Sequence, residues 1–189
     1  MLAETEKPEI TAAMLEELSR HMRLSSGFAA DQSADVEAAL AASVAHLESV
    51  LSLCLIPRRF LWSAVLDAAG GAEAPVAPVR ALISVTRATG AETGEAIDAS
   101  AFKIESLANS SRFSGRAPRG IALDFVFDAG FGADWQTTPA DLRRAALILA
   151  AENFDQRRAT TTREMETRFG VAALIQPWRP LRLGMRRRA

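Results

Sequence analysis

The sequence is poor in the residues that build disulfides and metal centres. Its 189 residues include one cysteine, two histidines and no tyrosine. The single Cys54 excludes an internal disulfide framework and a multi-cysteine zinc site, and His21 and His46 are too few for a histidine-rich metal site. No apolar run reaches the roughly 18 residues that cross a bilayer. The first ten residues also lack the basic-then-apolar pattern of a secretion signal, so we expect a protein made in a reducing cytosol.

The motifs of common enzymes are missing as well. There is no phosphate-binding loop, no dinucleotide fingerprint, no HExxH motif and no nucleophile elbow. Glu16 with Glu17, and Glu164 with Glu166, are unsuitable as acid–base pairs, because residues one or two apart on a helix do not face each other. We therefore expect a protein that is not an enzyme, and we predict no catalytic, cofactor-binding or metal-binding residue.

The composition that remains is that of one folded globular domain. Apolar residues make up 49% of the chain and charged residues 24%, with a formal net charge of −1, and these are average values. The charge is unevenly spread, because from residue 157 onwards nine arginines stand against Glu164 and Glu166. Such an end meets an acidic partner or nucleic acid, or else it is a solvated basic tail.

Three segments have the apolar periodicity of helices, at about residues 11–24, 33–55 and 138–157. Thr11, Ser33 and Thr138 are the expected N-caps, and Pro139 takes the first helical position of the third helix. Cys54 falls on the apolar stripe of the second helix, so we interpret it as a buried residue rather than a reactive thiol. The third helix is apolar around most of its girth, which predicts burial against other elements or against another subunit.

The middle of the chain alternates apolar and polar residues. This pattern predicts strands at about residues 60–66, 79–88, 102–107 and 121–127. In the second strand, Val79, Ala81, Ile83 and Val85 share one face. Together these strands predict a small antiparallel sheet or an extended hairpin.

The remaining segments are interpreted as irregular. Leu2–Pro8 is expected to be a loose lead-in, and Asn109–Gly120 a mobile basic loop. Residues 169–189 are expected to be an extended basic tail, because Pro177 and Pro180 flank Trp178. The predicted fold class is thus mainly α with a small antiparallel sheet (α+β). It has a helical-bundle body, protruding strands and an extended C-terminal tail, with residues 1–168 forming a single domain.

The order of these elements resembles that of head–tail connector proteins, also called adaptor or head-completion proteins, of long-tailed bacteriophages and phage-derived gene transfer agents. The resemblance rests on His21-Met22-Arg23-Leu24, on Leu55-Ile56-Pro57-Arg58-Arg59-Phe60-Leu61-Trp62, on Phe127-Asp128-Ala129-Gly130-Phe131-Gly132, on Thr138-Pro139-Ala140-Asp141-Leu142, on Glu152-Asn153-Phe154, and on Gly170-Val171 to Pro177-Trp178-Arg179. In that family, tyrosine usually occupies the glycine–aromatic–glycine turn and the end of the third helix. Phe131 and Phe154 stand there in this chain, which retains the packing and loses two hydroxyls.

The resemblance implies a structural protein of the virion neck, found in a virion or virus-like particle and assembled in the bacterial cytoplasm. The family implies a ring, typically of twelve subunits, seated on the portal, where it extends the DNA channel and links the DNA-filled head to the tail. Its implied partners are the portal protein, the next neck protein (a stopper or tail terminator), other copies of the chain, and DNA that passes without sequence-specific contact. No cofactor and no membrane are implied.

Three groups of residues are then candidate contact sites. Trp178 and Arg179 are expected to anchor the tail on the portal, because aromatic and arginine side chains are frequent interface anchors. Alternatively, Trp178 folds back onto the core. The remaining candidates are, for the portal contact, Pro180, Leu181, Arg182 and Leu183; for a loop facing the channel or the next neck protein, Arg112, Arg116 and Arg119; and for subunit packing, Leu142, Leu149 and Phe154.

A second class of function stays open at this point. The basic C-terminal end would also suit a bacterial nucleic-acid-binding or regulatory module. That interpretation predicts steeply salt-dependent binding to free DNA, whereas a connector protein is expected to bind free DNA weakly.

Overall fold

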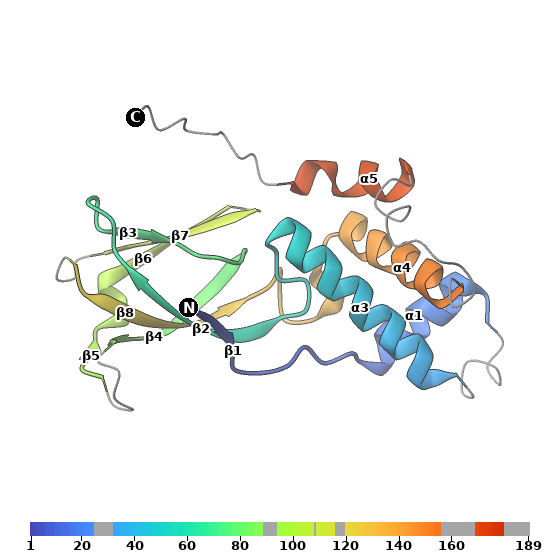
Figure 1. Ribbon diagram of the computed structural model, residues 1–189, viewed down its shortest axis with the longest axis horizontal. Coiled ribbons are helices and arrows are strands. Elements are labelled where there is room, and N and C mark those ends of the chain that lie inside the picture. The colour runs from blue at the N-terminus through green and yellow to red at the C-terminus, as the bar shows by residue number, and fades with distance from the viewer. Residues whose placement is uncertain (25–31, 89–93, 108, 116–119, 156–168, 180–189) are drawn as a thin grey trace.

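The computed structural model describes residues 1–24, 32–88, 94–107, 109–115, 120–155 and 169–179. A group of helices and a pair of β-sheets lie at opposite ends of an elongated molecule (Figure 1). The described helices are α1 (Ala12–Met22), α3 (Ser33–Leu51), α4 (Ala140–Asp155) and α5 (Phe169–Ile175). The predicted helical-bundle body is therefore only half of the fold, which is a more even mixture of helices and sheets.

The helices pack through one apolar cluster. α3 lies against α4, α1 contacts both, and α5 covers a further side of α4 (Figure 1). The cluster includes Met14, Leu40, Leu47 and Leu142, all at most 1% exposed, and Val171 of α5 at 2%. α1 begins as predicted, because the Met14 backbone N–H donates to the Thr11 hydroxyl.

The other two helices begin and end differently from the prediction. α3 ends at Leu51 rather than near residue 55, because Ser52 takes a left-handed conformation with φ of 56°. Its N-cap is Gln32, which makes no side-chain cap hydrogen bond. The Thr138 hydroxyl, expected to cap α4, instead donates to the Leu55 carbonyl at 2.8 Å. This bond joins the start of α4 to the turn that follows α3.

The strands form two antiparallel sheets. The larger has the order β1 (Leu2–Glu4), β2 (Arg58–Val65), β8 (Ala122–Ala129), β4 (Val79–Arg87) and β5 (Ala96–Ile97). The smaller has the order β3 (Gly71–Glu73), β7 (Ser110–Gly115) and β6 (Phe102–Leu107). Short 3-10 turns complete the fold at Ala99–Ala101, Trp135–Thr137 and Gln176–Trp178.

Aromatic side chains fill the space between the two sheets. Phe113 of β7 stacks on Phe125 of β8 with ring centroids 5.1 Å apart, and Trp62 lies beside both. Phe102 meets Phe125 edge-on at 5.5 Å. The alternation predicted for the strand at 121–127 is confirmed, because Leu123, Phe125 and Phe127 are fully buried. The two sheets therefore form a β-sandwich with a core of its own.

Four sequence-based predictions about the chain's local structure are wrong. Leu2–Glu4 of the expected lead-in form the edge strand β1, and half of the expected basic loop is strand β7, in which Phe113 is fully buried. Residues 169–175 are helical rather than extended. In β4, register shifts after Val79 and Leu82 break the expected alternation, so Ile83 is 44% exposed.

Candidate functional site

Arg58 links the sandwich to the helices through side-chain hydrogen bonds. Arg58 opens β2 directly after Pro57, and its guanidinium turns back to Glu48 in the last turns of α3. Two hydrogen bonds join them, from Nη1 to Oε1 at 2.9 Å and from Nη2 to Oε2 at 2.8 Å. Nη2 also donates to Glu4 of β1 at 2.8 Å. We call these three residues the junction cluster.

Burial and charge have opposite effects on the guanidinium of Arg58 in the junction cluster. Burial works to lower the pKa of the Arg58 guanidinium, but its hydrogen bonds and attraction to Glu48 outweigh this and raise it above its usual range. Glu48 Oε1 also accepts the backbone N–H groups of Leu55 and Ile56, at 2.7 and 3.3 Å. One carboxylate thus satisfies both the arginine and the turn after α3, which fixes the angle at which the sandwich leaves the helices.

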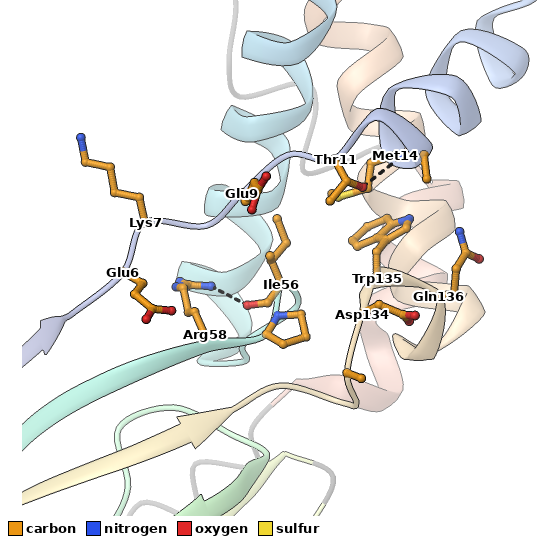
Figure 2. A pocket seen from close by; sticks show the side chains of 13 residues that line it. Glu6, Lys7, Glu9, Thr11, Met14, Ile56, Arg58, Asp134, Trp135 and Gln136 are labelled. Carbon is orange, nitrogen blue, oxygen red and sulfur yellow. Dashed lines mark hydrogen bonds between the residues drawn. The ribbon is translucent and has the colours of Figure 1, made fainter. Parts of the chain in front are cut away.

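Beside the junction cluster lies a groove of about 330 Å³. It lies between the segment that joins β1 to α1 and the turn that precedes α4 (Figure 2). We call it the strap groove, after the strap of residues 5–11 that borders it. It is lined by Glu6, Lys7, Glu9, Thr11, Ala13, Met14, Ile56, Pro57, Arg58, Ala133, Asp134, Trp135 and Gln136.

The far wall of the strap groove is held rigidly. Trp135 is only 4% exposed, and its indole N–H donates to Glu17 of α1 at 2.8 Å. The turn before it needs Gly130, whose φ is 130° and at which a side chain would come within 2.9 Å of the Pro57 backbone. The turn at Gly130 therefore packs directly against Pro57, and the residues that follow it, Ala133 to Gln136, line the groove.

Trp178 and Arg179, which were predicted to anchor the tail on the portal, follow the C-terminal end of α5. Trp178 packs edge-on against Phe131, with ring centroids 5.5 Å apart, and joins the apolar cluster of the helices. This arrangement is the fold-back alternative that the sequence left open. Arg179 is exposed. Pro180, Leu181, Arg182 and Leu183 lie outside the described residues.

Of the arginines predicted to face the channel, only Arg112 lies within the described residues. Arg112 lies in β7, where it pairs with Asp67 and stands in register between Glu73 and Glu105 on the neighbouring strands. Glu73, Glu105, Ser110 and Arg112 line a common pocket on the smaller sheet, and the hydrogen bond to Asp67 raises the pKa of Arg112. The local charge around Arg112 is thus acidic. Arg116 and Arg119 lie outside the described residues.

The residues predicted for subunit packing lie within the chain's own core. Leu142 is fully buried and Leu149 is 2% exposed, and Phe154 packs partly buried against the same cluster. The apolar surface of α4 is covered by α3, α1 and α5. The sequence did not reveal α5, so it could not show that this surface is already used inside the subunit.

The thiol of Cys54 is not exposed for reaction. Cys54 is fully buried, and burial raises the pKa of its thiol to about 12 although the nearby Arg58 works against this. Among the described residues, no group of three or more histidine, cysteine, aspartate or glutamate side chains is placed to hold a metal ion. Within the same part of the chain, no helix is long and apolar enough to cross a membrane.

Solved structures give the comparison with known proteins, since no protein-family model and no curated protein matches the chain. One match is a chain of the neck of an empty gene transfer agent (GTA) particle computed with C6 symmetry. It is 28% identical over 100% of both chains, with a TM-score of 0.85. A chain of the virion of a native GTA particle is 28% identical over 98% of both chains, with a TM-score of 0.82.

A third match shares the fold. It is a chain of the neck of a native GTA particle computed with C12 symmetry, and it is 24% identical over 100% of both chains with a TM-score of 0.76. All three matches span essentially the whole molecule, sandwich and helices together. The chain therefore has the fold of a gene transfer agent neck protein, and the resemblance to head–tail connector proteins that its sequence motifs predicted is confirmed.

Proposed function

We propose that this chain is a structural protein of the virion neck, which joins the DNA-filled head of a gene transfer agent or phage particle to its tail. One observation carries the proposal: the full-length match, at 28% identity and a TM-score of 0.85, to a chain of a GTA particle neck. A match of this extent covers the sandwich, the helices and the junction cluster between them. The comparison thus concerns the whole molecule rather than a shared module.

The proposed assembly is a ring of twelve copies seated on the portal. The matched neck structures were computed with sixfold and twelvefold symmetry, and a twelve-membered ring is compatible with both. Each subunit of a ring uses two different surfaces for its two neighbours. An elongated subunit with helices at one end and a sandwich at the other (Figure 1) offers such separate surfaces. It also leaves its two ends for the portal and for the next neck protein.

The proposed role is mechanical and involves no catalysis. Within the part of the chain that the structure describes, the largest pKa shifts are those of Arg58 and Cys54, and both side chains are buried where the sandwich meets the helices. Their contacts fix the shape of the subunit rather than prepare a group for reaction. A rigid shape is what a connector that resists internal DNA pressure requires.

Mass photometry of the full chain, alone and mixed with the portal protein encoded nearby in the same genome, tests this proposal. We expect the portal ring to gain the mass of about a dozen subunits. Failure to associate with the portal, together with tight low-salt binding to duplex DNA, would overturn the proposal in favour of a nucleic-acid-binding module.

A further inference from the structure

The two outer faces of the β-sandwich differ in chemistry. In the smaller sheet, the positions that alternate with the buried Phe102 and Phe113 carry Lys103, Glu105 and Arg112. Charged side chains at such positions are typical of a strand face that stays in contact with water. The outer face of the larger sheet does not follow this rule, because aliphatic side chains occupy its middle.

Four aliphatic side chains of the larger sheet point away from the core of the sandwich. None of them belongs to either of the apolar clusters formed by the described residues. Burial alternates strictly along β8, which places Val126 on the outer side, and Leu61 of β2 stands opposite it in register. Val65 of β2 is 54% exposed, and Ile83, at a register shift of β4, is 44% exposed. We call Leu61, Val65, Ile83 and Val126 the outer apolar face.

The members of the outer apolar face are neighbours on the sheet. Leu61 pairs directly with Val126, and Val126 pairs with Ser84, which follows Ile83. Side chains that stand opposite each other on one face of an antiparallel pair are about 4.5–5.5 Å apart at Cβ. The aliphatic row therefore crosses β2, β8 and β4, and Val65 extends it along β2. Scattered apolar residues are normal on a surface, but a contiguous patch marks an interaction site.

The charges around the outer apolar face cancel. Arg59 and Asp128 stand opposite each other and form two hydrogen bonds, of 2.8 and 3.2 Å. Asp124 accepts a hydrogen bond from the Ser63 hydroxyl, and the exposed Arg80 at the other register shift of β4 balances its charge. A face without net charge offers no electrostatic attraction to DNA or to an acidic protein surface. It fits a partner that presents an uncharged, apolar surface of its own.

We propose that the outer apolar face is covered by a neighbouring copy of this chain. The inference rests on the proposed ring and names a surface through which one subunit meets the next. The matched necks were computed with sixfold and twelvefold symmetry, and in a cyclic assembly every copy has another copy on each side. The strands of the larger sheet run along the length of the molecule (Figure 1), so this face is a flank. An elongated subunit whose ends meet the portal and the next neck protein meets its neighbours through its flanks.

The size of the face suits a contact that forms within a ring. β2 and β8 have eight residues each. Three such strands, about 4.8 Å apart and rising about 3.3 Å per residue, cover roughly 15 by 26 Å, or about 400 Å². A stable pair of free proteins buries about 800 Å² on each partner. We therefore expect the free chain to be a monomer, and the contact to form where the portal holds several copies side by side.

Photo-crosslinking in the assembled ring identifies what covers this face. Full-length chain carrying Val65→p-benzoylphenylalanine is mixed with an excess of unmodified chain, assembled on the portal and irradiated. We expect products that join two copies of this chain, at least about tenfold more than from Glu16→p-benzoylphenylalanine, because the reactive group must touch its target. Glu16 is the control, since it is exposed on α1 at the helical end of the molecule (Figure 1).

The products separate this inference from the proposed function. A full ring that gives cross-links to the portal alone, or no more chain-to-chain product from Val65 than from Glu16, would overturn the inference and leave the proposed function standing. If the unmodified chain adds no ring to the portal, the proposed function fails, and the inference fails with it.

A charge placed on the face gives a second test. Val65→Glu should raise at least about tenfold the concentration of chain at which the ring on the portal is half complete, because an unpaired carboxylate is costly to bury against a neighbour. Val65→Thr keeps the β-branched shape and is the matched control, with a much smaller effect. Because Val65 is 54% exposed, both variants should unfold as free subunits at the temperature of the unmodified chain. Unchanged ring formation by Val65→Glu would overturn the inference.

Discussion

Arg58 and Glu48 face each other through two parallel hydrogen bonds of 2.9 and 2.8 Å, with only 7% and 10% of their side chains exposed. Arg58 belongs to the sandwich and Glu48 to the helices, so this pair is the polar link between two separate apolar cores. A bidentate pair of this kind fixes direction as well as distance. The relative orientation of the two halves of the subunit therefore depends on it.

Removing the carboxylate should destabilise the whole subunit. Glu48→Ala leaves a buried guanidinium with Glu4 as its one remaining ionic partner among the described residues, and it removes the acceptor of the Leu55 N–H. Breaking a buried pair from one side costs about 3–5 kcal/mol. We expect a loss of that size in the free energy of unfolding, measured by urea denaturation with circular dichroism.

Two further variants serve for comparison. Glu48→Gln keeps Oε1 as an acceptor for the Leu55 N–H but loses the charge and the hydrogen bond from Arg58 Nη2 to Oε2, so its cost should lie below that of Glu48→Ala. Glu16→Ala is the matched control, because Glu16 pairs with Arg20 on the surface of α1 and such exposed pairs contribute about 0.3–0.5 kcal/mol. Equal effects of Glu48→Ala and Glu16→Ala would show that the junction cluster contributes no special stability.

The buried thiol of Cys54 should make stability fall at high pH. Burial raises its pKa from 9.0 to about 12, so the folded state holds the proton more tightly than the unfolded state does. This contribution is complete below about pH 9 and is lost as the pH rises towards about 12. The free energy of unfolding should therefore decline over that window, and the decline should be smaller in Cys54→Ala.

Alkylation reports on the same thiol. Native protein at about pH 8 should resist iodoacetamide, whereas urea-unfolded protein should react rapidly, because only the exposed thiol forms its thiolate there. Equal rates in the two states would contradict the burial of Cys54.

The elements that the sequence predicted are those whose own side chains carry a periodic signal. α1, α3, α4 and β8 each place apolar residues at regular spacing. β7 carries one large apolar residue, Phe113, and its stability comes from pairing with β3 and β6. β1 is exposed throughout and is defined only by its pairing with β2. Such strands depend on partners distant in the sequence, which a local pattern does not contain.

The candidate site was still less predictable. The strap groove is built from residues 6–14, 56–58 and 133–136, which meet only because the junction cluster and the turn at Gly130 bring them together. α5 has seven residues, too few to be stable alone, and it is held by packing against α4. The prolines near Trp178 favoured an extended chain, whereas α5 and the 3-10 turn Gln176–Trp178 stand there, and these short elements carry too few residues for a periodic signal.

Two truncations should therefore behave differently. Ending the chain after Arg179 leaves every described residue of the apolar cores in place, so we expect the free subunit to keep its unfolding temperature. Ending it after residue 168 also removes Val171 and Ile175, which are 2% and 6% exposed. Each such side chain is worth about 1–4 kcal/mol, so the shorter chain should unfold at a clearly lower temperature in differential scanning fluorimetry.

Only the longer truncated chain is then a clean test of binding. If it joins the ring on the portal as well as the full chain does, the residues after Arg179 have no role in assembly. If both truncated chains unfold at the same temperature, α5 does not stabilise the helices.

Leu149→Ala should lower the free energy of unfolding of the free subunit, whatever its effect on ring formation. Leu149 is 2% exposed inside the cluster formed by α3, α4 and α5, and truncating such a leucine costs about 2–5 kcal/mol. The loss should appear in urea unfolding of the free subunit. Val50→Ala on α3 is the matched control, because Val50 is 39% exposed and should lose less than about 1 kcal/mol. The opposite result, a free subunit of unchanged stability that no longer adds to the portal ring, would mean that α4 presents Leu149 to a neighbour. The side chain would then have to leave the core on assembly, and α5 would be the element displaced.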